Sequence, residues 1–478
     1  MEVLNTAAEL RAIQHASPIV TLALHRFVIA FLYGAFQGPR NVSSLSSILD
    51  AGRFDPTVIG RYARSTQEQF WLFHPERPFL QDPRLPEEMK SDSDAPASIF
   101  QLLREAAPPR GKTLFDHTVS AQEGSLTAAE AARYLLADQF FALQDGRGYT
   151  PSMLTFGAAL FVTGQNLFET LALNLVPYNS ESPIKSFVDK DRPFWDRDAF
   201  DPAPFPDGWL DYLTRPYRRL FLVSSNGSTV THIYRKAATA IDREWRSQAT
   251  DPWIASRVTD KGVRPIPFSA DRALWRDSHA LVQHLAGREK GAPGYENLLV
   301  RLDRGASIEA LGVVARNNEV DLWRHERLPL PRHYLTDSDL VDQLGRTLQL
   351  AEDAAKILRS SLWSLAKMAL FPSGNPEQKR VRSLVDSLAV ERPYWAALDT
   401  PFRRLMVALA DAWPRYKQDV PIGEWALAIQ KSAESAFEAA ACSLETSGRG
   451  LRAAAEARAR FGAQLHRTLE AFLPVSSA

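Results

Sequence analysis

Histidines, carboxylates and one cysteine are the side chains of this sequence on which metal binding or nucleophilic catalysis would depend. The ten histidines are scattered, and none forms an H-E-x-x-H pair or another spacing that places two ligands on one helical face. The strings "WRHER" and "FHPERP" set a histidine beside or near a glutamate, but adjacent residues on an extended chain point to opposite sides. The residues therefore predict no metal site.

Motifs for nucleotide chemistry and acyl transfer are missing from the sequence as well. No P-loop and no G-x-G-x-x-G follow a strand-like run, and no G-x-S-x-G elbow is present. The adjacent carboxylates Glu87 and Glu88 lie in a polar stretch typical of solvated side chains. Cys442, the only cysteine, excludes an internal disulfide, and its alanine-rich helical surroundings predict that it is packed. We therefore expect no catalytic residue and no cofactor.

Recognition of a partner is better represented, first by the stretch "GVVARNNEVDLWRHERLPLP", Gly312–Pro331. Two apolar runs flank a polar tip at Asn317, Asn318 and Glu319, and asparagine tolerates the positive φ of a tight turn. The pattern predicts a β-hairpin, braced by Trp323 and the charged residues that follow it. The tip is either an ordinary solvated turn or a rigid finger that is inserted into a partner.

Two further stretches have the composition of binding loops. The segment "QDGRG" contains Gln144, Gly146, Arg147 and Gly148, and its glycines allow a close approach to a flat or charged surface. The alternative for this segment is a helix end followed by a turn. A basic cluster surrounds a second predicted hairpin and is a candidate for phosphate contacts, with a solvated face as the alternative. Its members are Arg215, Arg218, Arg219, Arg235 and Lys236.

Composition limits the class of protein. A chain of 478 residues with 45% hydrophobic and 23% charged residues is globular and has room for about two or three domains. The 56 basic residues balance the 56 acidic ones, so any contact with nucleic acid must be local or shared with partner subunits. The apolar segment Pro18–Phe36 carries His25 and Arg26 in its middle, which favours a buried helix over a membrane span. We expect a cytoplasmic protein with no signal peptide.

The pattern of elements predicts an α+β fold with a mixed domain over residues 1–334. Thr127 and Glu130 form a capping box at the start of one helix, and another helix is predicted from Met153 to Leu175. Strand patterns dominate from Tyr212 to Val320, where Asn226-Gly227 marks a hairpin. Residues 335–478 read as long amphipathic helices joined by short breaks, which predicts a separate four-helix bundle.

Several strings spread along the chain resemble the large subunit, CasA, of the type I-E CRISPR surveillance complex Cascade. They are "FWLFHPERPFLQ" (70–81), "KTLFDHT" (112–118), "SLTAAEAARYLLADQFFAL" (125–143), "GQNLFETLALNLVP" (164–177), "DRPFW" (191–195), "DRALWRDSHAL" (271–281), "ARNNEVDLWRHERLPLP" (315–331) and "ERPYWAALDTPFRRLM" (391–406). None is a catalytic signature, but their order matches the family over nearly the whole chain. Family members usually begin with a further segment that contains a pattern such as F-N-L-L-x-x-P-W-I-P-V, which this sequence lacks.

The resemblance implies a non-catalytic subunit that works with other Cascade subunits and a guide RNA, away from membranes. It implies that the chain senses the protospacer-adjacent motif in double-stranded target DNA and wedges the strands apart to start the R-loop. It also implies a docking surface for the helicase–nuclease.

The resemblance also assigns residues. The family's wedge aligns with Asn317, Asn318 and Glu319, where a glutamine is known at the last of these positions. Its glycine loop falls at Gln144–Gly148, and its lysine finger at Arg235 or Lys236. A loop that contacts the guide RNA covers Pro109–His117, with Lys112 and Phe115 as the anchoring residues.

Two other functions remain open at this point. One is an enzyme whose site is assembled from scattered residues, such as Asp116, His117, His325 and Glu326. The other is a scaffold subunit that contacts only protein.

Overall fold

The computed structural model describes the chain in thirteen stretches that contain most of its residues. These are residues 1–91, 95–103, 124–144, 148–178, 191–197, 199–248, 251–260, 262–269, 272–286, 306–316, 319–372, 375–413 and 418–474. The chain forms two compact units. The first comprises Met1–Phe268, His284–Leu302 and Ala306–Arg327, and the second comprises Ser269–Gln283, Asp303–Gly305 and Leu328–Ala478.

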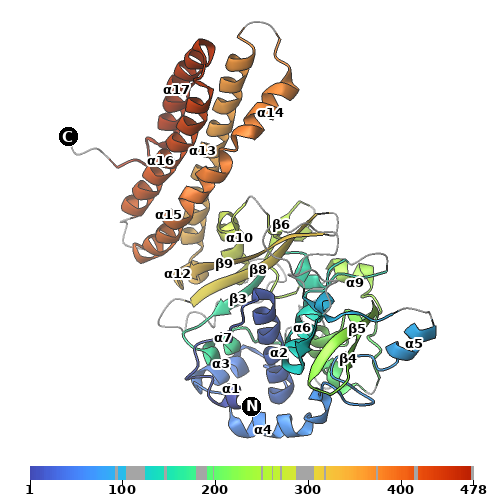
Figure 1. The fold of residues 1–478 in the computed structure, drawn as a ribbon. Coiled ribbons are helices and arrows are strands. Elements are labelled where there is room, and N and C mark those ends of the chain that lie inside the picture. The colour runs from blue at the N-terminus through green and yellow to red at the C-terminus, as the bar shows by residue number, and fades with distance from the viewer. Residues whose placement is uncertain are drawn as a thin grey trace. The chain divides into compact units, whose positions relative to one another are not determined.

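The first unit is built around helix α2, Pro18–Phe36, which packs against α4, α6 and α8 (Figure 1). Ser17 caps this helix by accepting a hydrogen bond from the Val20 amide at 3.2 Å, and proline occupies the first helical position. Among the described helices, α2 alone has the length and composition to cross a membrane, but half of its most apolar window is buried inside the protein. Arg26 is buried in an ion pair with Asp251 at 3.2 Å, so α2 is a core helix of this unit.

The other helices of the first unit are short, as expected for a mixed fold. They are α1 (Glu2–Asn5), α3 (Val42–Asp50), α4 (Pro56–Ser65), α5 (Leu85–Ser91), α6 (Ala128–Phe140), α7 (Leu167–Leu173), α8 (Trp209–Thr214) and α9 (Arg243–Gln248). Helix α10 (Ser278–Leu285) begins in the second unit and ends in the first. Short 3-10 turns lie at Glu68–Phe70, Ile99–Leu102, Met153–Thr155, Phe194–Asp196 and Leu274–Asp277.

The described residues of the first unit also form three small sheets. In the largest, β5 (Thr229–Ala237) pairs with β4 (Arg218–Ser224), β1 (Ala97–Ser98) and β2 (Leu126–Thr127). The second has the order β3-β8-β9, from β3 (Ala159–Thr163), β8 (Ala306–Arg316) and β9 (Glu319–Leu330). The third is a ribbon of β6 (Ser256–Thr259) and β7 (Gly262–Pro265).

The hairpin predicted at Asn226-Gly227 is confirmed. Strands β4 and β5 pair antiparallel on either side of it, and Gly227 has the positive φ, +69°, that the turn requires. The Asn226 side chain accepts hydrogen bonds from the backbone amides of Ser228 at 3.0 Å and Thr229 at 2.9 Å. The capping box at Thr127 and Glu130 is also confirmed, with both reciprocal hydrogen bonds present.

The helix predicted from Met153 to Leu175 is wrong. The segment folds as a 3-10 turn, then strand β3, and then the short helix α7. The apolar run Ala158–Val162 is buried and leads into β3, which pairs antiparallel with β8. Such a run lacks the alternation of apolar and polar residues by which strands are recognised. Gly157 and Gly164 bound the strand at positions where a Cβ atom would clash with neighbouring side chains.

The second unit is predominantly helical. It contains α12 (His333–Thr336), α13 (Ser338–Leu370), α14 (Gln378–Leu388), α15 (Glu391–Asp411), α16 (Asp419–Leu444) and α17 (Gly448–Leu469). Helix α13 packs against α15, α16 and α17, and their shared core is rich in leucine and alanine (Figure 1). The α+β fold with C-terminal helices is thus confirmed. The predicted domain boundary between residues 334 and 335 remains a prediction.

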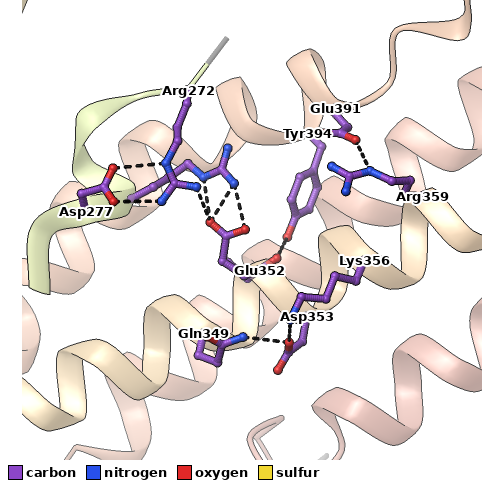
Figure 2. A network of polar contacts seen from close by, with 11 residues as sticks. Arg272, Asp277, Gln349, Glu352, Asp353, Lys356, Arg359, Glu391 and Tyr394 are labelled. Carbon is purple, nitrogen blue, oxygen red and sulfur yellow. Dashed lines mark hydrogen bonds and ion pairs between the residues drawn. The ribbon is translucent and has the colours of Figure 1, made fainter. Parts of the chain in front are cut away.

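The helical unit includes a distant segment, Ser269–Gln283, that the sequence did not assign to it. Trp275 of this segment is fully buried, and its ring stacks on Phe402 with 4.5 Å between centroids and 20° between planes. Around it, the Arg276 guanidinium donates to both carboxylate oxygens of Glu352 at 2.7 and 2.8 Å, and Arg272 bridges Glu352 and Asp277 (Figure 2). The segment is therefore fastened by both an aromatic stack and a charge network.

Candidate nucleic-acid interface

Helix α6 is the element around which the candidate recognition residues gather. Its C-terminal half is buried, including the polar residues Asp138 and Gln139, both at 0% exposure. The Gln139 side chain bonds to the backbone at the start of β4, accepting from the amides of Tyr217, just before the strand, and Arg218 at 2.9 and 3.0 Å. These hydrogen bonds fix the C-terminal end of α6 to the sheet, and with it the start of the segment that follows the helix.

The candidate loop Gln144–Gly148 begins four residues after the end of α6. Gln144 and Gly148 are both exposed, and Gly148 has a φ of +89° with open space where a Cβ atom would lie. This backbone conformation strains any side-chain-bearing residue, so glycine is favoured here. Gly146 and Arg147 lie outside the described residues.

Arg235 and Lys236 occupy opposite faces of β5. Arg235 pairs across the sheet with Leu220, which is fully buried, whereas Lys236 pairs with Arg219 on the other face. The Arg235 guanidinium lies 3.6 Å from the carboxylate of Asp138 in α6, and its side chain is only 12% exposed. Lys236 is half-buried. The Arg235 side chain is thus engaged within the protein, whereas Lys236 lies on the outward face, where its charge contributes to lowering the pKa of Glu88.

The prediction of a surface cluster of five cations around this hairpin is wrong. Arg215 and Arg218 are buried, at 1% and 0% exposure, and donate to backbone carbonyls, including Thr239 and Thr150, both at 2.8 Å. Burial lowers the pKa of Arg215 from its ordinary value. These guanidiniums serve as internal hydrogen-bond donors, which a count of charges along a sequence does not distinguish from surface cations.

Arg219 is also engaged within the protein. It donates to Asp82 at 2.7 Å and to Glu88 at 2.6 Å, and these hydrogen bonds lower the pKa of Glu88 and raise that of Arg219. Burial raises the pKa of the Asp82 carboxyl, but the hydrogen bonds from Arg84 and Arg219 outweigh this effect, so the pKa of Asp82 is lowered. Arg219 and Lys236 thus share the outward face of the hairpin with the Glu88 carboxylate.

The hairpin predicted at residues 312–331 is confirmed as the pair β8 and β9. Strand β8 ends at Arg316 and β9 begins at Glu319. Asn317 and Asn318 lie outside the described residues, and Glu319 is the first residue of β9. Behind the tip, the Trp323 ring meets the Phe141 ring edge to face, with 5.9 Å between centroids. Because Phe141 directly follows α6, the hairpin and the loop Gln144–Gly148 share one support.

The residues of the alternative catalytic site do not form a cluster in the described part of the chain. His325 pairs with Glu309 across the hairpin at 3.3 Å, and Glu326 pairs instead with Arg324 at 2.7 Å. Asp116 and His117, together with the anchor residues Lys112 and Phe115, lie outside the described residues. Within those residues, no group of three histidine, cysteine or acidic side chains is close enough to hold a metal ion.

Cys442 is exposed, which corrects the prediction that it is packed. Its neighbours Ala440 and Ala441 face the core of the helical unit, and the helical turn directs Cys442 towards Glu438 on the outer face. The helix around Cys442 was predicted correctly, but the face on which Cys442 lies was not.

Sequence reasoning missed the supporting residues Asp138, Phe141 and Tyr149. The Tyr149 ring lies against two guanidiniums, those of Arg218 at 5.0 Å and Arg235 at 5.5 Å. The one available signal was Asp138 itself, an acidic residue inside the apolar run "LLADQFFAL". A buried carboxylate requires a cationic partner, but nothing in the sequence identifies that partner as Arg235.

The sequence is similar to known proteins over most of its length. Residues 1–441 match the family described as CRISPR-associated protein Cse1. The CRISPR-associated protein CasA/Cse1 of Thermus thermophilus is 31% identical over 490 aligned residues, covering 96% of this chain and 92% of the relative.

Solved structures show the same fold. The crystal structure of Thermus thermophilus CasA matches with a TM-score of 0.79 and 27% identity, covering 98% of this chain and 94% of that one. A chain in a structure described as a CRISPR RNA-guided surveillance complex matches with a TM-score of 0.75 and 21% identity, covering 96% and 94%. The extent of these matches, over both units of the fold, shows that the chain belongs to the CRISPR-associated Cse1 (CasA) family.

Proposed function

We propose that this chain is the large subunit of an RNA-guided DNA surveillance complex. In this role it senses the protospacer-adjacent motif in duplex DNA, opens the adjacent base pairs to start the R-loop, and recruits the helicase–nuclease. Membership of the Cse1 family and the likeness to a chain of a surveillance complex support the assignment to such an assembly.

The observation that carries the DNA-sensing role is the convergence of three elements on the end of α6. The loop Gln144–Gly148 follows this helix, Arg235 of β5 pairs with its Asp138, and Trp323 of the hairpin packs on Phe141. One helix thus supports the loop and the hairpin and also holds β5, the strand that carries Lys236 on its other face. These parts offer contacts for backbone phosphates and for a base step. A scaffold that contacts only protein has no need for this arrangement.

Lys236, and not Arg235, is the residue we assign to the DNA. Arg235 is on the inward face of β5 and is neutralised by Asp138, so exposing it to a phosphate would break a largely buried ion pair. Lys236 lies on the outward face, where one ammonium can neutralise one phosphate. The chain's balanced net charge fits a single local contact, with the remaining phosphates neutralised by other subunits.

The hairpin of β8 and β9 is the proposed wedge. Separating one base pair beside the motif costs on the order of 1.4 kcal/mol in stacking, and a wedge must offset that cost with a rigid support. The third strand, β3, and the Trp323–Phe141 contact stiffen the hairpin from two sides. Asn317 and Asn318 supply amides for unpaired base edges, and we assign the larger part to Asn318 because the neighbouring Glu319 carboxylate is repelled by phosphates.

The remaining assignments concern partners. We propose that Lys112 and Phe115 anchor the subunit to the guide RNA, that the chain itself catalyses no reaction, and that it acts in the cytoplasm. The isolated chain should then show no nuclease or ATPase activity. Such an activity in a pure preparation, abolished by a point substitution in this chain, would favour the enzyme alternative.

The proposal is tested in a reconstituted complex with the neighbouring subunits and guide RNA. Binding is measured to two duplexes that share the guide-matched sequence and differ only in the motif, using wild type, Lys236→Ala and Lys431→Ala. Lys431 is an exposed lysine of α16 in the helical unit and serves as the matched control. We expect Lys236→Ala alone to weaken binding and to reduce the salt slope by about one. Equal binding of both duplexes by the wild-type complex would leave the scaffold function instead.

A further inference from the structure

Helix α5 packs against strands β4 and β5 of the hairpin whose outward face carries Arg219 and Lys236. Leu85 and Met89 of this helix are buried, and they hold the intervening Glu88 beside Arg219. The Glu88 carboxylate accepts a hydrogen bond from the Arg219 guanidinium, with 2.6 Å between Oε1 and Nη2. Helix α5 thus supplies an acidic partner to the outward face of the hairpin.

The Arg219 guanidinium has two attachments that differ in exposure. Its Nε donates to Asp82 at 2.7 Å, and the Asp82 side chain is fully buried and also accepts two hydrogen bonds of 2.9 Å from Arg84. Its Nη2 donates to Glu88, whose side chain is 41% exposed. Because the buried attachment fixes the orientation of the guanidinium, the exposed carboxylate can be exchanged for another oxyanion while Arg219 stays in place.

Lys236 acts on the same carboxylate from the neighbouring strand. It pairs with Arg219 across the sheet, so both side chains lie on one face. The pKa of Glu88 is lowered first by the hydrogen bond and the charge of Arg219 and further by the charge of Lys236, against the opposing effects of burial and Asp82. Two cations thus act on one accessible carboxylate, which is the arrangement in which proteins also hold a phosphate group.

We infer that Arg219 and Lys236 form a site for one phosphate of the DNA backbone, and that Glu88 occupies this site until DNA displaces it. The inference rests on the proposed function, because it takes duplex DNA as the source of the phosphate. A carboxylate and a phosphodiester both present two oxygens and one negative charge to a guanidinium, so one can replace the other. Glu88 then lowers the affinity for every duplex alike, and it shortens the residence of the complex on DNA without the motif.

Removal of the Glu88 charge tests this exchange in the complete complex. Glu88→Gln should bind duplexes with and without the motif about threefold to fivefold more tightly, because a phosphate no longer has to displace a partly exposed ion pair. Glu87→Gln is the matched control, since it removes the same charge from the adjacent residue of α5, whose carboxylate pairs with Lys90 at 2.9 Å and is 80% exposed. The gain should be absent from Glu87→Gln. It should also be absent when Glu88→Gln is combined with Lys236→Ala, which lacks one cation of the site.

A second measurement uses the isolated full-length chain and a short duplex that contains neither the motif nor a match to the guide. The site predicts tighter binding and a steeper salt dependence for Glu88→Gln than for wild type or Glu87→Gln. A gain in this measurement, together with equal binding of motif and non-motif duplexes by the wild-type complex, would support the site and overturn the proposed motif sensing. The two inferences can therefore fail separately.

Three results would overturn the site. Equal gains in Glu87→Gln and Glu88→Gln would show general repulsion between acidic residues and DNA. Binding by Glu88→Gln that is no tighter than that of wild type, or a gain that persists without Lys236, would show that Glu88 does not compete with phosphate there. A change in assembly on the guide RNA with unchanged DNA binding would assign the site to an RNA phosphate and not to DNA.

Discussion

The Trp323 ring of the hairpin meets the Phe141 ring at 5.9 Å between centroids and 86° between planes. This edge-to-face geometry is the favourable arrangement for two aromatic rings and is worth about 0.5–1.5 kcal/mol beyond the area that it buries. The contact lies behind the hairpin tip on one side and immediately before the loop Gln144–Gly148 on the other. It therefore links the two parts of the proposed DNA site that are far apart in sequence.

We predict that Trp323→Leu and Phe141→Leu each slow R-loop formation by about threefold to tenfold, and that the double variant is no slower than the worse single one. Stopped-flow measurement of strand opening in the complete complex gives the coupling energy. The control is the edge-to-face pair Phe54–Phe168 of the first unit, at 4.8 Å. Its leucine variants should couple in thermal stability but not in opening rate. Additive effects of Trp323→Leu and Phe141→Leu on the rate would contradict a shared support.

The tip should matter for opening DNA more than for holding it. Truncation of Asn317, Asn318 and Glu319 to alanine should slow R-loop formation on fully paired target by up to about tenfold, the equivalent of one unreplaced base-pair step. On a target already mismatched beside the motif, the same variant should be nearly normal, because the opening cost has been removed. Equal defects on both targets would show that the tip grips DNA, and no defect on either would make it a solvated turn.

Much of the fold follows from local sequence signals. Asn226-Gly227 predicts the β4–β5 turn because few residues adopt its positive φ, and Thr127 with Glu130 predicts the start of α6 because the capping box is a local structure. The hairpin around Asn317 and the long C-terminal helices are likewise evident from periodicity. These elements depend on neighbours in sequence and not on the tertiary environment.

The remaining features depend on contacts that no local pattern encodes. Strand β3 was read as a helix because its burial on both faces removes the alternation of a typical strand. Arg218 was read as a surface cation because its acceptors, the carbonyls of Leu143 and Thr150, are known only from the fold. The residues assigned to DNA were named by family resemblance, whereas their support by Phe141 and Tyr149 emerged only from the three-dimensional arrangement.

The cross-strand pair His325–Glu309 makes hairpin stability depend on pH. The hydrogen bond between them, at 3.3 Å, raises the pKa of His325 and lowers that of Glu309. The charge of Arg327 partly offsets the rise in the pKa of His325, and His25 further lowers the pKa of Glu309. The contribution of His325 is complete below its ordinary pKa of 6.5 and is lost as the pH rises through its higher folded value. That of Glu309 is present above 4.5 and is lost as the pH falls through its lower folded value.

We therefore predict that the pair stabilises the hairpin most between these two pKa values, near pH 5–6. The effect should remain below about 1 kcal/mol, because the two side chains are 45% and 30% exposed and are screened by solvent. Chemical denaturation of wild type and His325→Gln, compared at pH 5.5 and pH 8.5, should show a larger difference in unfolding free energy at the lower pH. His466→Gln, which alters an exposed helical His–Glu pair with 3.9 Å between atoms, is the control. A difference that grows towards pH 8.5 would contradict the assignment.

Trp275 should be required for the full stability of the helical unit although it is distant in sequence from the long helices. The centroid of its buried ring lies 4.5 Å from that of Phe402, 5.9 Å from that of Trp395 and 6.1 Å from that of Trp425. The guanidinium of Arg276 lies 3.5 Å from the centre of the Trp395 ring. Replacing a buried tryptophan by alanine typically costs about 3–5 kcal/mol. We expect Trp275→Ala to lower the unfolding free energy of the helical unit by this amount. The control is Trp71→Ala, at an exposed tryptophan of the first unit, which should leave the unfolding free energy of the helical unit unchanged.

The isolated helical unit gives the sharper test. A fragment starting at Leu335 should melt as a helical protein, but it lacks Trp275 and also Tyr334, which is fully buried and donates to the Met406 carbonyl at 2.9 Å. A fragment starting at Leu328 should therefore be more stable than the shorter one. Adding the peptide Ser269–Gln283 at about a hundred times its Kd should stabilise the longer fragment by about 2.7 kcal/mol, because binding to the folded state alone shifts the equilibrium. The same peptide with Trp275→Ala should have no effect at equal concentration. Identical melting of the Leu328 fragment with and without the native peptide would show that the helices complete their core without Trp275.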